Sequence, residues 1–361
     1  MRLACSLSYF LFSGVFLLVW LSITGFNFEP FGVHVMLDGF AYLPIDSNLY
    51  LETNIHELHH INVSGMGTNY LPVLIGDISQ WLSPEQPYLF VLLLNFFLLN
   101  IAFLVFLKLV PRKNCLLVFV IWLLLPLSYF SMTSLNKEVL LFVNVIFFLS
   151  FLVKYSEKKQ LRFLVGMACV MTMAFFTRNL LFLAELGAFF YIFVRVKKVF
   201  WVSLILASLI LPFVMVLTNG HLLGDSFYNI QNVASEKSMQ TGKIFEQSTQ
   251  LYNYPFGFIV SYFIHGAIYL FAPMLNPRYI EGLFVRINLS EMFLVLSSIY
   301  VSIILILLFL KRKLIQDSPI HALLYVYLLL TFLLPISQHR YLLPMYPVLL
   351  YLLFVKRYSI S

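Results

Sequence analysis

Long apolar blocks that recur along the whole chain constrain its fold more than any other feature. Short polar stretches separate the blocks, and a helix needs about 20 mostly apolar residues to cross a bilayer core. Of the 361 residues, 61% are hydrophobic and only 11% are charged, whereas about a quarter of the residues in a soluble domain are charged. The pattern predicts an all-α polytopic membrane protein that forms a single membrane-embedded domain over residues 1–361.

The lengths and spacings of the blocks predict about ten transmembrane helices. One further block, residues 256–275, follows Pro255 and contains Pro273, and we expect a re-entrant or interfacial helix there. The ten expected spans cover residues 7–25, 88–108, 115–133, 139–155, 163–177, 180–195, 199–217, 291–310, 319–337 and 341–355.

Basic residues follow alternate blocks, and the positive-inside rule places such clusters in the cytoplasm. If residues 256–275 do not cross, nearly all the clusters fall on one side, and both termini are expected to be cytoplasmic. We therefore expect a multi-pass membrane protein whose basic clusters face the cytoplasm. The clusters comprise Lys108, Arg112, Lys113, Lys154, Lys158, Lys159, Arg162, Arg195, Lys197, Lys198, Lys311, Arg312, Lys313, Lys356 and Arg357.

The same topology assigns the acidic residues to the other side of the membrane. Only Glu157 and Asp317 of the 16 Asp and Glu residues would be cytoplasmic. Two long outer segments result, residues 26–87 and 218–290. We therefore look for the chemistry on the outer face, since the cytoplasmic loops are short and basic and suit lipid headgroups better than catalysis.

The outer segment 26–87 contains a match to the zinc motif H-E-x-x-H. His56, Glu57 and His60 have its spacing, which puts two histidines on one helix face with a general base beside the first. The surrounding residues are polar, however, whereas such a helix normally packs within a core. A loop that faces headgroups is the alternative interpretation of these residues.

Two further candidate groups lie where apolar blocks begin or end. Lys137 and Glu138 fall in a short outer turn, where they either snorkel or reach a phosphate at the outer leaflet. Arg178 lies at the outer mouth of a helix, and Glu185, seven residues later, falls inside the apolar block. A structural Arg178–Glu185 network and a catalytic role for Glu185 both fit, because an acid buried in a membrane is rarely without function.

The late turn PISQHRYLLPMYP brings His339 and Arg340 together between prolines. A guanidinium group beside an imidazole suits bidentate binding of phosphate. In the second outer segment, Arg278 and Arg286 follow an aromatic stretch that suits the membrane surface. These four residues, with Lys137 and Arg178, are the candidate substrate-binding residues.

The first outer segment also combines carboxylates with aromatic rings. Asp38 and Asp46 lie among Tyr42 and Tyr50. Aromatic faces stack on the CH groups of sugars, while carboxylates accept protons from hydroxyl groups. Asp38, Asp46, Glu138 and Glu185 are therefore the candidate catalytic acids. A solvated loop with interfacial aromatics is the alternative.

In its architecture the whole chain resembles the Wzy-type O-antigen and capsule repeat-unit polymerases, and more distantly the GT-C glycosyltransferases that use polyprenyl-linked donors. The resemblance is carried by the Leu/Phe-rich spans, the two outer segments and the outer basic residues in SLNKE, TRN and QHRYLLPMYP. It implies a location in the bacterial inner (cytoplasmic) membrane, a catalytic acid at Asp38 or Asp46, and binding of a lipid diphosphate by Arg178, Arg278, Arg286 and Arg340. The paired Arg-to-Gly loop repeats of some polymerases are lacking.

We therefore expect a glycosyltransferase that transfers sugar outside the cytoplasm, from a polyprenyl (di)phosphate-linked glycan to a sugar acceptor, without a cofactor. Repeat-unit polymerisation of an envelope polysaccharide is the most specific form of this expectation. Expected partners are the lipid-linked glycan, membrane lipids and other proteins of envelope-glycan assembly, and no nucleic acid. The alternatives are a lipid-linked-sugar transporter or flippase, a zinc metalloprotease built on His56, Glu57 and His60, and a non-catalytic assembly subunit.

Overall fold

The fold is that of a helical bundle, seen in a computed structural model of the chain. The structure describes residues 1–23, 35–37, 40–42, 70–132, 137–217, 289–314, 316–332 and 339–354, together with six helical residues between positions 257 and 267. The helices are α1 (Arg2–Ile23), α4 (Tyr70–Leu82), α5 (Pro87–Leu109), η2 (Arg112–Asn114), α6 (Cys115–Leu123), α7 (Pro126–Met132), α8 (Lys137–Lys158), α9 (Leu161–Thr177), α10 (Asn179–Phe193), α11 (Lys197–Leu217), α16 (Leu289–Leu310), α17 (Pro319–Phe332), η5 (His339–Met345) and α18 (Tyr346–Phe354).

Each block expected to span the membrane contains helix, which confirms the helical architecture, and several apolar helices suggest a multi-pass membrane protein. Within the described residues, three helices are long and apolar enough to cross a bilayer, namely α1, α5 and α8. Shorter apolar helices accompany them, among them α9, α10 and α17. The number of ten spans stays a prediction.

The expected span 115–133 is divided into two short helices, α6 and α7, because Pro126 has no N–H group to continue the ladder. Neighbouring groups take up the carbonyls near the break. The Tyr300 hydroxyl donates to the carbonyl of Ile121 at 3.0 Å, and the Tyr129 hydroxyl donates to that of Leu123 at 3.0 Å. In an apolar environment, a carbonyl group that loses its helical partner needs another hydrogen-bond donor, and these hydroxyl groups supply one.

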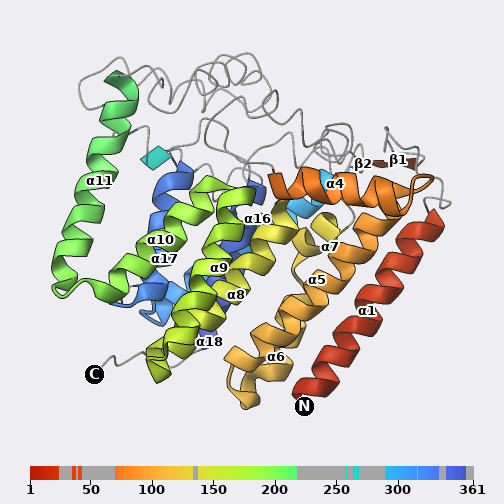
Figure 1. Ribbon diagram of the computed structural model, residues 1–361, viewed down its shortest axis with the longest axis horizontal. Helices are drawn as coiled ribbons and strands as arrows, with labels where there is room; N and C mark the ends of the chain where they lie inside the picture. Colours follow the sequence, from red (N-terminus) through yellow and green to blue (C-terminus); the bar gives the residue numbers. More distant parts are fainter. Residues whose placement is uncertain are drawn as a thin grey trace.

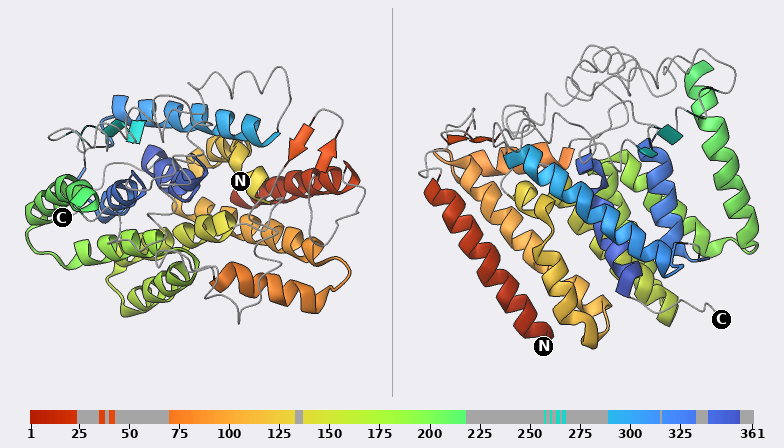
Figure 2. Two further views of the ribbon diagram at one scale, coloured as in Figure 1. Left: turned by 90° about the horizontal axis from the view of Figure 1, so that it is seen from above. Right: turned by 180° about the vertical axis from the view of Figure 1, so that it is seen from behind.

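Helix α18 lies in the middle of the bundle, between α8 on one side and α16 on the other (Figure 2). Every residue from Tyr346 to Leu353 is buried. Helix α8 is buried on most of its surface as well, as expected for helices that are apolar all round. Helix α11 stands apart from these central helices (Figure 1).

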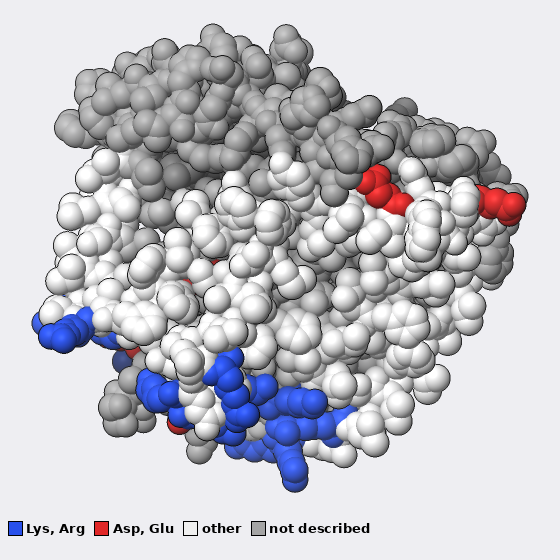
Figure 3. All heavy atoms as spheres, in the orientation of Figure 1, with Lys and Arg blue, Asp and Glu red and all other residues white. Residues whose placement is uncertain are grey.

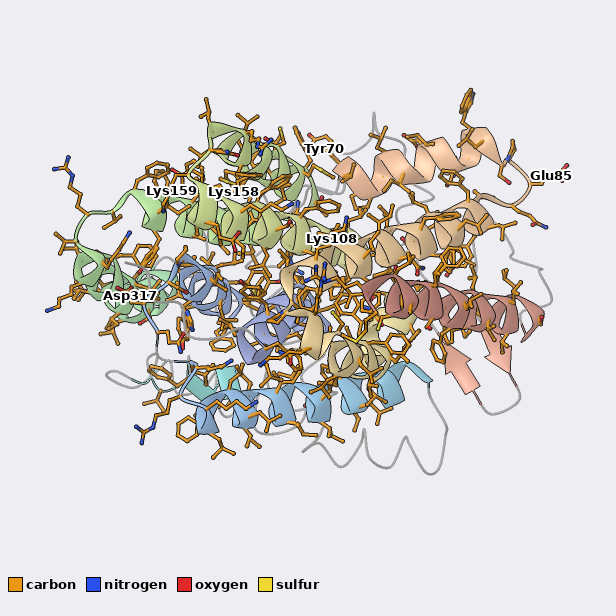
Figure 4. The ribbon with its side chains drawn as sticks, turned by 90° about the horizontal axis from the view of Figure 1, so that it is seen from below. Tyr70, Glu85, Lys108, Lys158, Lys159 and Asp317 are labelled. Atoms are coloured by element: carbon orange, nitrogen blue, oxygen red, sulfur yellow. The ribbon has the colours of Figure 1, made fainter. Side chains whose placement is uncertain are left out.

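The two ends of the bundle differ in charge. Lys and Arg gather along one end (Figure 3), which we call the basic end and which includes Lys108, Lys158 and Lys159 (labelled in Figure 4). The Arg2 guanidinium donates to the Val110 carbonyl at 2.7 Å at this end. We call the opposite end, where α8 begins and where α9 meets α10, the Arg178 end.

The expected outer segment 26–87 contains structure that the hydropathy pattern did not predict. Strands β1 (Val35–Leu37) and β2 (Phe40–Tyr42) pair antiparallel, with Met36 opposite Ala41. Helix α4 lies across the Arg178 end (Figure 1) and packs against α5 and α9. The expected re-entrant helix at 256–275 falls outside the described residues, apart from the six helical residues mentioned above.

Candidate functional site

Arg178 lies at the point where the α9–α10 hairpin turns. Its backbone is extended, with φ −165° and ψ 113°, so it ends α9 and precedes α10. Its N–H donates to the Ala174 carbonyl at 2.6 Å, and its own carbonyl accepts from the N–H of Leu181 at 3.1 Å. The side chain is only 6% exposed. A guanidinium group is thus held inside protein at the Arg178 end, where a cation needs partners.

Lys137 and Glu138 begin α8 and do not stand in an open turn. Glu138 is 1% exposed, whereas Lys137 is half-buried. The amide of Asn144 donates to the Val170 carbonyl at 2.8 Å, which fixes the register of the antiparallel helices α8 and α9. Glu138 lies six residues from this bond along α8, and Phe176 lies six residues from it along α9, so both are about 9 Å from the bond.

This register places a buried carboxyl group and a buried guanidinium group at the same end of one helix pair and at nearly the same height. Lys137, Glu138 and Arg178 each have interaction partners. In a low-dielectric setting, charged groups at one level interact more strongly than they would in water. The sequence had placed these residues on the outer face, and the structure brings them to one level.

The short helix η5 brings His339 and Arg340 to the same region. It packs against α8, and α18 continues from it to the basic end, where the Asn114 amide donates to the Phe354 carbonyl at 3.3 Å. Together η5 and α18 extend roughly 26 Å from that bond, because the rise per residue is about 2.0 Å in η5 and about 1.5 Å in α18. Helix α8 is about 32 Å long, so the backbone of His339 lies near the level of Glu138.

Other buried polar groups fix the elements around this level. The Asn95 amide donates to the carbonyls of Ser131 and Met132 at 3.4 and 3.3 Å, and so caps the end of α7 just before α8 begins. Tyr70 of α4 contacts the ring of Phe176 edge-on, with centroids 6.1 Å apart. Neither Asn95 nor Tyr70 was among the predicted site residues, although an Asn inside an apolar block is a detectable signal.

Glu185 lies deeper in the bundle, two turns from Arg178 along α10. It is completely buried, and neither carboxyl oxygen has a hydrogen-bond partner among the described residues. The predicted burial of this acid is confirmed. The alternative of a structural Arg178–Glu185 network finds no support in a hydrogen bond between them, since neither Glu185 oxygen has a partner among the described residues. The two backbone positions lie about 10 Å apart along the helix axis.

A second polar cluster, at the basic end, was not predicted. Asp317 accepts hydrogen bonds from the Tyr191 hydroxyl and from the Trp201 indole N–H, the latter at 2.7 Å. The Lys197 ammonium lies 4.3 Å from the centre of the Tyr191 ring. These contacts join the α16–α17 loop to α10 and α11 near Asp317 (labelled in Figure 4). They anchor the first turn of α11 and suit a structural role.

The remaining predicted site residues lie outside the described residues. They are the acids Asp38 and Asp46, the arginines Arg278 and Arg286, and the zinc-motif residues His56, Glu57 and His60. For His339 and Arg340 the structure describes the backbone alone. Within the described part of the chain, no group of three or more His, Cys, Asp or Glu residues could hold a metal ion.

The Arg178 end is therefore the candidate site, with Lys137, Glu138 and Arg178 at its level and η5 beside them. Comparison of the chain with models of protein families, with curated proteins and with solved structures finds no match.

Proposed function

We propose that the protein transfers glycosyl groups on the outer side of the membrane, from a polyprenyl diphosphate-linked glycan to a sugar acceptor. The polymerisation of envelope polysaccharide repeat units is the specific reaction we favour. The observation that supports it best is the burial of Glu138 and Arg178 at one level of the α8–α9 pair. Charged residues buried in a membrane protein pair with other groups and mark substrate or catalytic sites.

In this proposal, cations of the Arg178 end hold the diphosphate of the donor. The acceptor hydroxyl oxygen forms a bond to the anomeric carbon, while the bond from that carbon to the diphosphate oxygen breaks. The diphosphate leaves with the electron pair, and Arg178 with Arg340 stabilises its developing charge. A carboxylate takes the proton of the hydroxyl, and Glu138, Asp38 and Asp46 are the candidates. The reaction balances without a metal or nucleotide.

The chain length of the envelope polysaccharide in a deletion strain tests the proposal. We expect the strain to lose the long-chain ladder on a gel while single repeats remain, and the wild-type chain to restore the ladder. Arg178→Ala should reduce long chains about tenfold or more, because a charge-assisted hydrogen bond contributes about 1.5–3 kcal/mol. Glu138→Gln should act in the same direction, and Arg178→Lys should restore part of the ladder.

Arg162→Ala is the matched control. Arg162 lies on the same helix as the Arg178 junction, but it is exposed, and its partner is Gln160 at 2.9 Å. It should leave the ladder unchanged. His56→Ala should do the same if zinc has no role. The proposal is wrong if Arg178→Ala and Glu138→Gln both keep the full ladder at normal protein level. It is also wrong if the deletion strain itself makes the long-chain ladder.

The isolated acid Glu185 favours a second candidate function, transport of a lipid-linked sugar across the membrane. Membrane-buried acids often line transport paths. In that case the deletion strain would lack single repeats on the outer face as well as long chains, since the substrate would stay inside. Surface labelling of the single repeats distinguishes the two functions.

A further inference from the structure

Glu185 is isolated from other charged groups on its own helix and on the helices that pack against it. Helix α10 carries no other charged residue. On α9 the only charged residue is Arg162, in the first turn at the basic end. Helix α17 carries no Lys, Arg, Asp or Glu, and its histidine, His321, lies near the basic end. Arg178 follows α9 about 10 Å away along the axis of α10. No counter-charge therefore faces Glu185 from these elements.

The surroundings of Glu185 are apolar and closely packed. Its neighbours along the buried face of α10 are Leu181, Ala184 and Ala188, all completely buried. On the same helix, a Cβ atom at Gly187 would lie 3.1 Å from a methyl carbon of Val326, so α10 and α17 approach closely two residues from Glu185. An isolated ionised carboxylate is far more costly in such a place than a neutral carboxylic acid.

Two buried residues of α17 near the level of Glu185 carry hydroxyl groups, Tyr327 at about the same level and Thr331 nearer the Arg178 end. Helices α10 and α17 are antiparallel, because Asp317, just before α17, bonds Tyr191 near the end of α10. With Gly187 opposite Val326, Thr331 lies about 4.5 Å from the level of Glu185, toward the Arg178 end. The Thr331 hydroxyl is buried and also has no hydrogen-bond partner among the described residues. A neutral hydroxyl cannot balance a negative charge.

We propose that Glu185 is a proton-binding site in the interior of the bundle, occupied by a proton in the arrangement described. The ligand is H⁺, which adds to one carboxylate oxygen to give a neutral carboxylic acid, and the same proton leaves when the site opens to water. The inference goes beyond the proposed glycosyl transfer, because it holds whether the donor glycan is polymerised or transported.

Infrared spectroscopy of the purified full chain in lipid tests the proposal directly. At neutral pH we expect a carbonyl stretching band of a protonated carboxylic acid that shifts in D₂O. The band should be missing from the spectrum of Glu185→Gln, which keeps the size of the side chain. It should remain in Glu157→Gln, because Glu157 is exposed at the basic end and is not part of the buried site.

Chemical labelling gives a second measurement. Dicyclohexylcarbodiimide enters apolar regions and adds to a protonated carboxyl group, and the whole reagent stays on the oxygen or moves to form an acylurea. Mass spectrometry should find it on Glu185 in the wild type, whereas a water-soluble carbodiimide should label Glu157 instead.

The proposal is overturned if Glu185→Gln removes a carboxylate band and leaves the carboxylic acid bands unchanged, whatever the labelling shows. It is also overturned if the water-soluble reagent labels Glu185 as readily as Glu157. Neither result depends on the polysaccharide ladder, so failure of this proposal and failure of the proposed function are distinguishable.

Discussion

Asn144 shows how one polar side chain can fix the register of two long helices. It is buried in the contact of α8 with α9, and its amide donates to the carbonyl of Val170 at 2.8 Å. The register in turn brings Glu138 to the level of the α9–α10 junction. A hydrogen bond between membrane helices contributes about 0.6 kcal/mol on average and up to about 1.7 kcal/mol.

Asn144→Ala should therefore lower the stability of the purified protein by about 1–2 kcal/mol, because it removes this bond and leaves a small cavity. Asn144→Leu refills the volume with apolar atoms and should lower the stability by about half as much or less. The Val170 carbonyl lies inside α9 and can keep its hydrogen bond within that helix. Thermal unfolding in detergent measures both variants. Equal losses for Ala and Leu would contradict the explanation.

The burial of a single residue could be predicted where that residue interrupts an apolar block. Contacts between distant parts of the chain could not be predicted. Glu185 was expected to be buried because an acid within an apolar block has nowhere else to go, and the structure confirms this. The pairing of Asp317 with Tyr191 and Trp201 joins positions more than 110 residues apart. No local pattern encodes that contact. The same holds for Asn95, whose partners lie in α7.

At the scale of helices, α10 and α17 form the closest pair around Glu185, and a glycine allows the approach. A Cβ atom at Gly187 would meet the side chain of Val326 at 3.1 to 3.5 Å. Valine is stiff in a helix, because one χ1 rotamer dominates. The contact therefore has little room to adapt to a larger residue.

Gly187→Leu should push α10 from α17 and destabilise the protein by about 1–3 kcal/mol, the usual range for overpacking. Gly14→Leu is the matched control, since a Cβ atom at Gly14 meets only the Phe96 ring at 3.8 Å. It should be close to neutral in the same unfolding measurement. A loss for Gly14→Leu as large as that for Gly187→Leu would show that the glycine contact has no special effect.

The positions of the helices were largely predictable, because about 20 apolar residues leave few alternatives in a membrane protein. Breaks and short elements were not. Pro126 lies inside the block 115–133, which was predicted to be one span, but the structure divides this block into α6 and α7. Asp38-Gly39, which separates β1 from β2 in the sequence, is a known hairpin signal. In α4 the buried positions Pro72, Val73, Gly76 and Ser79 follow a helical period, within a segment expected to be loop.

At the scale of the whole molecule, the separation of charges between the two ends predicts an orientation. The basic end gathers the Lys and Arg residues of the described loops (Figure 3), and the positive-inside rule favours its placement in the cytoplasm. Glu85, in the turn between α4 and α5, is exposed at the other end, and Lys158, the last residue of α8, is exposed at the basic end (Figure 1).

Labelling with a membrane-impermeant maleimide checks this orientation. The background chain carries Cys169→Ser, because Cys169 is exposed whereas Cys5 and Cys115 are buried. We expect the Glu85→Cys variant to react in intact spheroplasts, and the Lys158→Cys variant to react only after lysis. The reverse pattern would place the Arg178 end in the cytoplasm and would remove the basis for chemistry on the outer face.

The broken helix formed by α6 and α7 has a consequence for the order in which the protein can be made. The carbonyl of Ile121 is completed by Tyr300, which the ribosome adds 179 residues later. The central helix α18, against which α8 packs, comes later still. The early helices of a nascent chain therefore enter the lipid before Tyr300 and α18 exist, so the site at the Arg178 end can close only after α18 has been made.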